Sequence, residues 1–254
     1  MHRVTLCVMF VSLLALVAVS AASQEDQEEP GDVGQVHFVK PKAGETLQWE
    51  AAYKSHVEWH RSKNDAWSWP VWEIVTGERA GQYAIGTFFH HWKDLEHGDL
   101  GADDNAHARE TLDRHTASST MEVWRYRSGV SNPPKSDDTP AYAAVYYRLL
   151  KQGMTGTYTG AVRKINDAIV KADWGVGYYR NVHVNSGEEP MMVRWVARRT
   201  WEDFAPPALS FPRLLEDAYG KEEAAAINDA LNRSIDRGWS EIWAYRPDLS
   251  YAPE

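Results

Sequence analysis

The feature that most constrains the fold of this chain is an internal duplication. The segment EVWRYRSGVS at 122–131 recurs as EIWAYRPDLS at 241–250, with the same residue at five of ten positions. Two further pairs match at an offset of 109 residues: WKDL (92–95) with WEDF (201–204), and VHFVKPKAG (36–44) with VYYRLLKQG (145–153). Three matches in the same order indicate two copies of one structural unit.

Both copies have the same predicted order of secondary-structure elements. Runs rich in β-branched and aromatic residues predict strands, apolar residues at helical spacing predict helices, and glycine-containing links predict hairpins. The first copy has predicted strands at 35–40, 71–75, 82–92 and 121–127, and predicted helices at 45–63 and 103–119. The second has predicted strands at 141–150, 178–184, 191–201 and 240–246, and predicted helices at 157–172 and 211–237. The order βαββαβ therefore occurs twice.

A duplicated βαββαβ chain resembles the dimeric α+β-barrel superfamily. The resemblance implies an α+β fold class: two tandem ferredoxin-like βαββαβ repeats whose antiparallel sheets face each other in an α+β barrel. In such families one sheet face carries helices, and the other lines a barrel that often holds a small organic ligand or haem. Members include monooxygenases, isomerases, haem-using enzymes and proteins without assigned activity. No segment of this chain selects one of them, so the reaction stays open.

The N-terminus has the composition of a secretory signal peptide, expected at residues 1–23. A basic start precedes an apolar run at 4–19, which is shorter than the roughly 20 residues that a spanning helix needs. A transmembrane anchor is the weaker alternative. We therefore expect cleavage near residues 21–23, no transmembrane anchor afterwards, and an exported protein, periplasmic or secreted. The only cysteine, Cys7, lies in this segment, so the mature chain has no disulfide.

The predicted domains are a disordered acidic leader at 24–34, repeat 1 at 35–130, a linker at 131–140 and repeat 2 at 141–251. Removing Arg3 from the 27 basic residues leaves 26 against 36 acidic ones, a net charge near −10. This charge argues against nucleic acid as a partner, because phosphate binding requires a basic surface. A small molecule is the expected partner, and the choice between monomer and homo-oligomer stays open.

A pair of histidines four residues apart lies on the first predicted helix. His56 and His60 continue a stripe at steps of three and four, and their counterparts in the second copy are Ile165 and Ile169. Because the counterparts are apolar, we expect both imidazoles to point toward the sheet. They are candidate metal ligands, with His90 of the third strand as the third. Histidines bonded within the core and an independent catalytic histidine are the alternatives.

A second candidate site is a ligand pocket between the two sheets. If Val36 and Phe38 face the helices, the residues expected to face the barrel include His37, His91, Tyr146, Arg194 and Arg198. Because guanidinium groups hold carboxylates in bidentate geometry, this set predicts an anionic or carbonyl-bearing small molecule. Arginines that reach solvent or pair with acids are the alternative interpretation of Arg194 and Arg198.

The sequence therefore predicts an exported barrel that binds, and in one version transforms, a small organic molecule. A non-catalytic envelope binding or scaffold protein is the alternative. A metal- or haem-dependent oxidoreductase that uses the histidines of repeat 1 is the third hypothesis, with a metal ion or haem as its cofactor. Whether the protein is an enzyme stays open.

Overall fold

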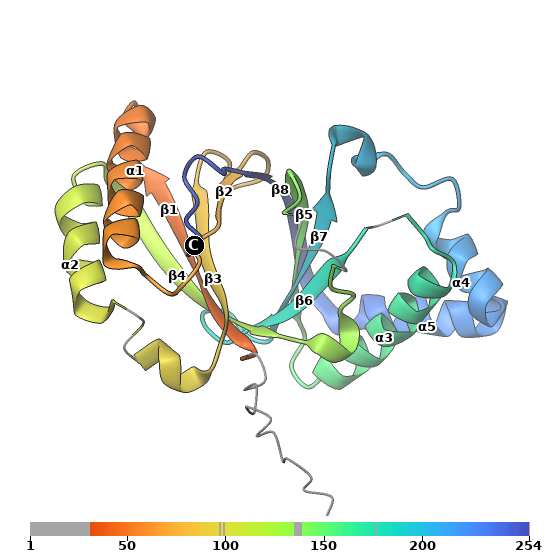
Figure 1. The fold of residues 1–254 in the computed structure, drawn as a ribbon. Helices are drawn as coiled ribbons and strands as arrows, with labels where there is room; N and C mark the ends of the chain where they lie inside the picture. The colour runs from red at the N-terminus through yellow and green to blue at the C-terminus, as the bar shows by residue number, and fades with distance from the viewer. Residues whose placement is uncertain (1–30, 97, 99, 135–138, 176, 254) are drawn as a thin grey trace, which may run out of the picture.

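The computed structural model describes residues 31–253 apart from 97, 99, 135–138 and 176 (Figure 1). The predicted signal peptide, most of the acidic leader and part of the predicted linker lie outside the described residues. In the described part of the chain, no helix has the length and apolar character needed to cross a membrane.

The first repeat contains four strands and two helices in the predicted order. Its strands are β1 (Val33–Pro41), β2 (Val71–Ile74), β3 (Tyr83–His90) and β4 (Thr116–Tyr126). Its helices are α1 (Thr46–Lys63) and α2 (Gly101–Leu112), with short 3₁₀ turns at Trp92–Glu96 and Ser128–Val130. The prediction of a helix up to residue 119 was wrong, because the segment from Thr116 pairs with β1 instead.

The second repeat has the same order. Its strands are β5 (Tyr142–Leu150), β6 (Tyr179–Val184), β7 (Met191–Arg198) and β8 (Ile235–Tyr245). Its helices are α3 (Thr155–Lys171), α4 (Phe211–Tyr219) and α5 (Lys221–Ser234), with a 3₁₀ turn at Trp201–Phe204. The single helix predicted at 211–237 is two helices, because Gly220 adopts φ 79° and ψ 166°, a conformation that ends α4.

The eight strands of the described residues form one closed antiparallel barrel in the order β1-β3-β2-β8-β5-β7-β6-β4. Each repeat contributes four adjacent strands, and the two sheets join where β2 pairs with β8 and β4 pairs with β6. Helices α1 and α2 cover the outside of the first sheet, and α3, α4 and α5 cover the outside of the second (Figure 1). The predicted fold class is confirmed.

The barrel interior is packed with large apolar side chains from both sheets. These include Val36, Phe38, Trp72, Ile74, Ala84, Trp124, Val145, Tyr147, Val193 and Trp243. The predicted strand faces were therefore wrong, because Val36 and Phe38 were expected against the helices. Over most of β1, β3, β5 and β7 both faces are buried, one in the barrel and the other under helices. Alternation alone therefore does not tell the two faces apart.

Candidate functional site

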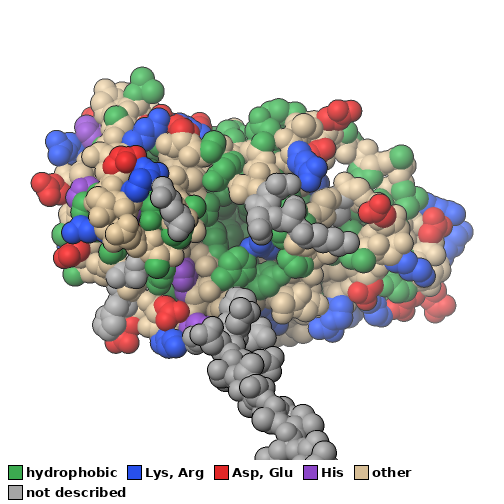
Figure 2. Space-filling view, in the orientation of Figure 1, with side chains coloured by type: hydrophobic (Ala, Val, Ile, Leu, Met, Phe, Trp, Pro, Cys, Tyr) green, Lys and Arg blue, Asp and Glu red, His purple; other side chains and the backbone are tan. Residues whose placement is uncertain are grey.

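A cavity of about 520 Å³ lies at the end of the barrel where β1, β2 and β6 begin. Aromatic side chains dominate its lining: Trp72, Phe88, Phe89, Trp124, Tyr126, Tyr178, Trp195 and Trp243. Figure 2 shows a recess with hydrophobic side chains at the centre of this face, between the two helix-covered halves. A cavity of this size and apolar character is typical of sites for small organic molecules.

Two glycines make room for one wall of the cavity. A Cβ atom at Gly34 of β1 would lie 2.7 Å from the Phe88 ring, and one at Gly86 of β3 would lie 2.5 Å from it. The ring of Phe88 therefore lies directly on the backbone of two neighbouring strands. The next residue, Phe89, has φ 67°, which interrupts the alternation of β3, and its side chain also lines the cavity.

The inner wall of the cavity is formed by two tryptophans from equivalent positions of the repeats. The rings of Trp124 and Trp243 stack with centroids 6.1 Å apart. Each indole N–H donates to the glutamate two residues earlier, Trp124 to Glu122 at 2.7 Å and Trp243 to Glu241 at 2.9 Å. Because these N–H groups already have acceptors, the wall presents apolar ring surface to a ligand.

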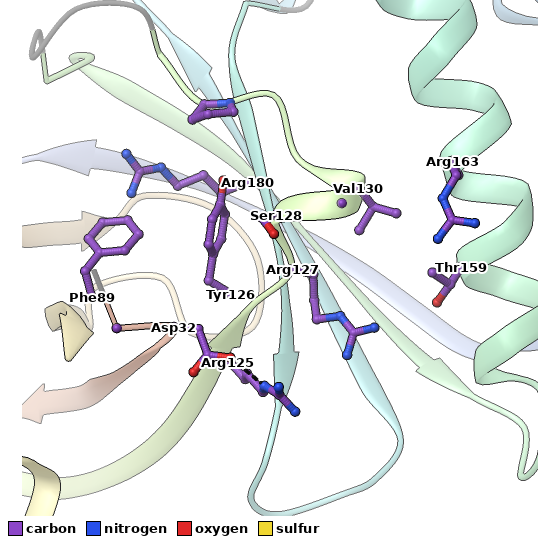
Figure 3. Close-up of a pocket in the computed structure, with 13 residues that line it drawn as sticks. Asp32, Phe89, Arg125, Tyr126, Arg127, Ser128, Val130, Thr159, Arg163 and Arg180 are labelled. Carbon is purple, nitrogen blue, oxygen red and sulfur yellow. Dashed lines mark hydrogen bonds and ion pairs between the residues drawn. The ribbon is translucent and has the colours of Figure 1, made fainter. Parts of the chain in front are cut away.

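A second hollow, of about 640 Å³, adjoins the cavity and contains four arginines (Figure 3). We call it the arginine cleft. Its arginines are Arg125, Arg127, Arg163 and Arg180, and its only acidic residue within the described part of the chain is Asp32. Asp32 accepts a hydrogen bond from Arg125 Nε at 2.8 Å, and the dashed line in Figure 3 marks this pair. The cleft is therefore strongly cationic.

Arg180 of β6 lies at the boundary between the cavity and the cleft, and it lines both. Its guanidinium lies over the ring of Phe89, 4.7 Å from the centroid. Burial lowers the pKa of Arg180, and the nearby Tyr126 and Tyr178 oppose that shift. No carboxylate among residues 31–253, as far as they are described, forms an ion pair with Arg180. A half-buried cation of this kind is suited to an anionic ligand.

The arginine cleft lies at the junction of the repeats where β4 pairs with β6, and the other junction, where β2 pairs with β8, contains acids that the cleft lacks. There, Arg246 follows β8 and pairs with three carboxylates: Glu50 at 2.5 Å, Glu73 at 3.0 Å and Asp248 at 2.9 Å. Lys54 of α1 also pairs with Asp248, at 2.9 Å. This junction therefore has two cations and three acids in one network.

At the arginine cleft the two cations are kept and the three acids are replaced. The repeat alignment and strand register make Arg127 equivalent to Arg246, and Arg163 equivalent to Lys54. The positions of the three acids hold Thr159, His183 and Gly129. Figure 3 shows the side chains of Arg127 and Arg163 extending into the same part of the cleft, from the end of β4 and from α3. The cleft therefore lacks acids at the three positions that pair with the cations of the other junction.

The residues predicted to line the barrel lie elsewhere, because the predicted strand faces were inverted. Arg194 points to the helices: its Nη1 donates to Asn166 Oδ1 of α3 at 2.8 Å, and its guanidinium stacks on Tyr179. Arg198 lies over the ring of Phe204, also outside the barrel. Burial lowers the pKa of both guanidinium groups, with nearby tyrosines opposing the shift.

The other three predicted ligand residues are also outside the cavity lining. Tyr146 packs against the apolar cluster under α3 and α4. His37 stands opposite Ile85, which packs against α1, so His37 faces the helices. Burial lowers the pKa of His37, and the charge of Asp104 opposes this shift. His91 follows β3, where its backbone N–H donates to Asp94.

The three predicted metal ligands are only partly brought together. His56 and His60 lie buried against each other, as their isoleucine counterparts indicated, with Nε2 atoms 3.1 Å apart. His90 does not join them. Its ring stacks on Trp67 with centroids 3.8 Å apart, and its Nε2 contacts Thr87 Oγ1 at 2.5 Å. Asp104 of α2 takes the third position instead.

Sequence reasoning did not single out the cleft arginines Arg127, Arg163 and Arg180, or Asp104 beside the two histidines. The alignment of the repeats already paired Arg127 with Arg246, so a comparison of their acidic neighbours would have revealed the cationic cleft. No comparable signal marks Asp104, because only the packing of α2 on α1 brings it near the histidines.

Comparisons with known proteins identify the fold class. No protein-family model matches the sequence, and no curated protein is similar to it in sequence. A putative monooxygenase from Lactobacillus acidophilus NCFM aligns with a TM-score of 0.55 and 9% identity, over 89% of this chain and 97% of that one. An anthrone oxidase-like protein aligns with a TM-score of 0.56 and 10% identity, over 86% and 92% of the two chains.

Chlorite dismutase from Candidatus Nitrospira defluvii, as a mutant, aligns with a TM-score of 0.53 and 12% identity, over 87% of this chain and 93% of that one. At such identities the similarity concerns the fold. These neighbours are dimeric α+β-barrel proteins, and this chain has their fold, with both ferredoxin-like units in one polypeptide.

Barrels of this fold class often hold haem, so we compared the cavity lining with the ligands that haem iron requires. The lining does not fit haem. Haem iron is held in proteins by histidine, cysteine or methionine, and less often by tyrosine. The described residues that line the cavity include no histidine, cysteine or methionine, and its tyrosines, Tyr126 and Tyr178, lie beside Arg180 at the mouth. The cavity is better matched to a ligand held by aromatic surfaces and one guanidinium.

Proposed function

We propose that the protein binds a small organic anion, with an apolar, flat part in the barrel cavity and the anionic group in the arginine cleft. One observation carries this proposal: the cleft keeps both cations of the opposite junction, Arg127 and Arg163, where the three acids are gone.

The electrostatics support an anion rather than a neutral ligand. Like charges that share a partly desolvated space repel each other, and a guanidinium is stabilised most by a carboxylate, sulfonate or phosphate that accepts two hydrogen bonds. Arg180 is placed to bind such a group at the point where the cleft meets the cavity. The anionic group then lies next to Arg180 while the rest of the ligand enters the cavity.

The shape of the cavity supports a flat, apolar body. Trp124 and Trp243 stack on each other in its inner wall, and Phe88 forms another wall. Aromatic walls favour ring systems, since offset stacking and edge contacts add to the hydrophobic gain. Neighbours of the same fold include putative monooxygenases and an anthrone oxidase-like protein, and their names support an organic ligand in this class of barrel.

The place of action is also a proposal. The sequence of residues 1–23 has the pattern of a secretory signal, so we infer that the protein meets its ligand in the periplasm or outside the cell. Binding is the function proposed here, and a transformation of the ligand would require it first.

A pair of fluorescent probes tests the proposal. Anilinonaphthalene sulfonate carries an aromatic body and a sulfonate, whereas N-phenylnaphthylamine carries a similar body without a charge. We expect one sulfonate probe to bind per chain, with at least about tenfold higher affinity than the neutral probe, a difference of about 1.4 kcal/mol. Equal affinities for the two probes would reject the anionic half of the proposal.

Substitutions in the cleft and in the cavity test where each probe binds. The double variant Arg127→Gln/Arg163→Gln should weaken the sulfonate probe by about tenfold and leave the neutral probe unchanged. Ala84→Leu, which fills the cavity, should weaken both probes, provided that circular dichroism shows an intact fold. Arg213→Gln/Arg233→Gln, at exposed positions of α4 and α5 that do not line the cleft, removes the same charge and is the matched control. An equal effect of that control would show non-specific attraction only.

A further inference from the structure

The polar cluster between α1 and α2 has the geometry of a three-ligand metal centre. His56 Nε2 lies 3.1 Å from His60 Nε2 and 3.2 Å from Asp104 Oδ1, and His60 Nε2 lies 3.3 Å from the same oxygen. The three atoms form a nearly equilateral triangle. Both imidazoles are buried, with exposed fractions of 5% and 4%, so the triangle is held by the core of the protein.

The size of the triangle matches a tetrahedral ion. With bonds of about 2.0 to 2.1 Å to nitrogen and oxygen, two ligand atoms of a tetrahedral ion lie about 3.3 to 3.4 Å apart. The observed sides of 3.1 to 3.3 Å therefore need almost no movement to accept an ion slightly above the plane. A fourth coordination position would remain, and the Asp104 side chain, 25% exposed, lies where solvent reaches the group.

Each imidazole is oriented by a contact on its other nitrogen. His60 Nδ1 lies 2.6 Å from Asp65 Oδ2, and His56 Nδ1 lies 2.8 Å from His107 Nδ1. Asp65 accepts further hydrogen bonds from the Trp67 backbone N–H at 2.9 Å and from Trp69 Nε1 at 2.7 Å, which fix its carboxylate. A histidine that donates from Nδ1 to a fixed carboxylate directs the lone pair of Nε2 toward the centre, as metal-binding histidines do.

The centre lacks a donor for its carboxylate oxygen. Asp104 Oδ1 is buried, and no donor among the described residues meets it with hydrogen-bond geometry, although both Nε2 atoms lie within ion-pair distance. A buried acceptor without a donor costs about 1 to 3 kcal/mol. A cation at the centre of the triangle would satisfy this oxygen and both lone pairs at once.

The fold itself does not require these polar groups. The equivalent positions in α3 hold Ile165 and Ile169, which are equally buried. In addition, none of the residues of α2, all of which are described, is fully buried. The contact of α2 with α1 therefore depends on the polar cluster more than on an apolar core. An ion bound to both helices would hold α2 in place.

We propose that His56, His60 and Asp104 bind one divalent first-row transition-metal ion. Two imidazole nitrogens and one carboxylate oxygen are the donor set of zinc and non-haem iron(II) sites, whereas magnesium and calcium prefer oxygen ligands. The site lies on the outer face of the first sheet, under α1 and α2, and the barrel cavity lies on the inner face. It is therefore independent of the anion site proposed above.

Metal titration of the full chain tests the site. Tag-free protein, stripped with a chelator, would be titrated with Zn²⁺ by calorimetry and with Co²⁺ by visible absorption, with Mg²⁺ as the ion that should not bind. We expect one Zn²⁺ per chain, the absorption bands of tetrahedral Co²⁺, a higher Tm and slower amide exchange in α2. Absence of stoichiometric Zn²⁺ and Co²⁺ binding would overturn the proposal and leave a hydrogen-bonded histidine cluster.

Variants separate this centre from adventitious binding. His56→Ile/His60→Ile copies the sister repeat, so it should fold and lose Zn²⁺ binding. Asp104→Asn should weaken binding by at least about tenfold, and Asp65→Asn by about 10- to 100-fold. His90→Ala, the third ligand predicted from sequence, is the matched control and should bind Zn²⁺ as the wild type does. Undiminished binding by the double isoleucine variant would overturn the assignment.

Discussion

Arg127 and Arg246 occupy equivalent positions after β4 and β8, but only Arg246 has carboxylate partners among the described residues. The backbone hydrogen bonds around both arginines follow the same pattern. The carbonyl of Arg127 accepts a hydrogen bond from Ser131 Oγ at 2.8 Å, and that of Arg246 accepts one from Ser250 Oγ at 2.9 Å. The two junctions therefore differ in side chains, and substitutions can convert one into the other.

The first prediction restores the missing acids. Gly129→Asp and Thr159→Glu place carboxylates at the positions of Asp248 and Glu50. An added Cβ at Gly129 meets no atom within 4 Å, so the substitution fits. We expect the new acids to pair with Arg127 and Arg163 and to weaken the sulfonate probe by at least about tenfold. Unfolding in urea should change by no more than about 1 kcal/mol, as is usual for exposed ion pairs.

The matched control for this pair is Gly129→Asn/Thr159→Gln, which adds the same bulk without charge. It should keep most of the affinity for the sulfonate probe. If the neutral pair weakened binding as much as the acidic pair, steric filling would explain the loss, and the electrostatic account of the cleft would be wrong.

The second prediction concerns a buried ion pair inside the barrel. Arg79 donates from Nε and Nη2 to the two carboxylate oxygens of Glu241, at 2.8 and 2.9 Å, and its guanidinium lies over the ring of Phe38. Glu241 is 2% exposed. Arg79→Met should destabilise the protein by about 3 to 5 kcal/mol, since it leaves a buried carboxylate without a partner. Urea denaturation at neutral pH measures this loss.

Removing the charges of both Arg79 and Glu241 separates the contribution of the ion pair from that of the apolar contacts of Arg79. The double variant Arg79→Met/Glu241→Gln should recover much of the stability lost in Arg79→Met, because the carboxylate that Arg79 pairs with is neutralised as well. A double variant as unstable as the single one would mean that the apolar contacts of Arg79, and not its charge, carry the effect.

The third prediction is a pH dependence at Glu122. Burial raises the pKa of this carboxyl above its ordinary value of 4.5, and the hydrogen bond from Trp124 and the charge of Arg79 oppose the shift. A raised pKa means that the protonated form is favoured in the folded protein. The corresponding stability is fully present below the ordinary pKa and is lost as the pH rises through the folded-state pKa.

Glu122→Gln should therefore have little effect on Tm at pH 4 and raise it at pH 7 to 8, where the wild type carries the buried charge. Each kcal/mol corresponds to a Tm change of roughly 2 to 4 °C for a chain of this size. Glu222→Gln, at an exposed position of α5, controls for the loss of one charge. A Glu122→Gln effect that is the same at both pH values would contradict the assigned burial.

The fold was predictable because the duplication constrains it twice. A strand or helix predicted in one copy supports the prediction of the same element in the other copy. The bounds of α1 were predicted to within one residue. The face that each strand presents was not predictable, since β1 alternates Val36 and Phe38 with His37 between two buried environments. Hydrophobic alternation identifies a strand, but it indicates which face points inward only where the other face is exposed to solvent.

The candidate sites were predictable only where a residue could be compared with its counterpart in the other repeat. The inward direction of His56 and His60 followed from their isoleucine counterparts. The placement of His90 did not, because the positive φ of Phe89 changes the course of the chain just before it. Asp104 becomes a neighbour of the histidines only through packing of two helices that are 38 or more residues apart in sequence.

The last prediction concerns the break between α4 and α5, where the sequence pattern had suggested one helix. Gly220 adopts φ 79° and ψ 166°, which a residue with a Cβ reaches only under strain. Gly220→Ala should therefore destabilise the protein by about 1 to 3 kcal/mol rather than fuse the helices. Gly160, inside α3, has an ordinary helical backbone and open space around its Cα, so Gly160→Ala should stabilise by about 0.5 to 1 kcal/mol. Opposite signs for these two substitutions in urea denaturation would confirm that backbone conformation, and not helix propensity, ends α4. A stabilising Gly220→Ala would instead show that the two segments can join into one helix.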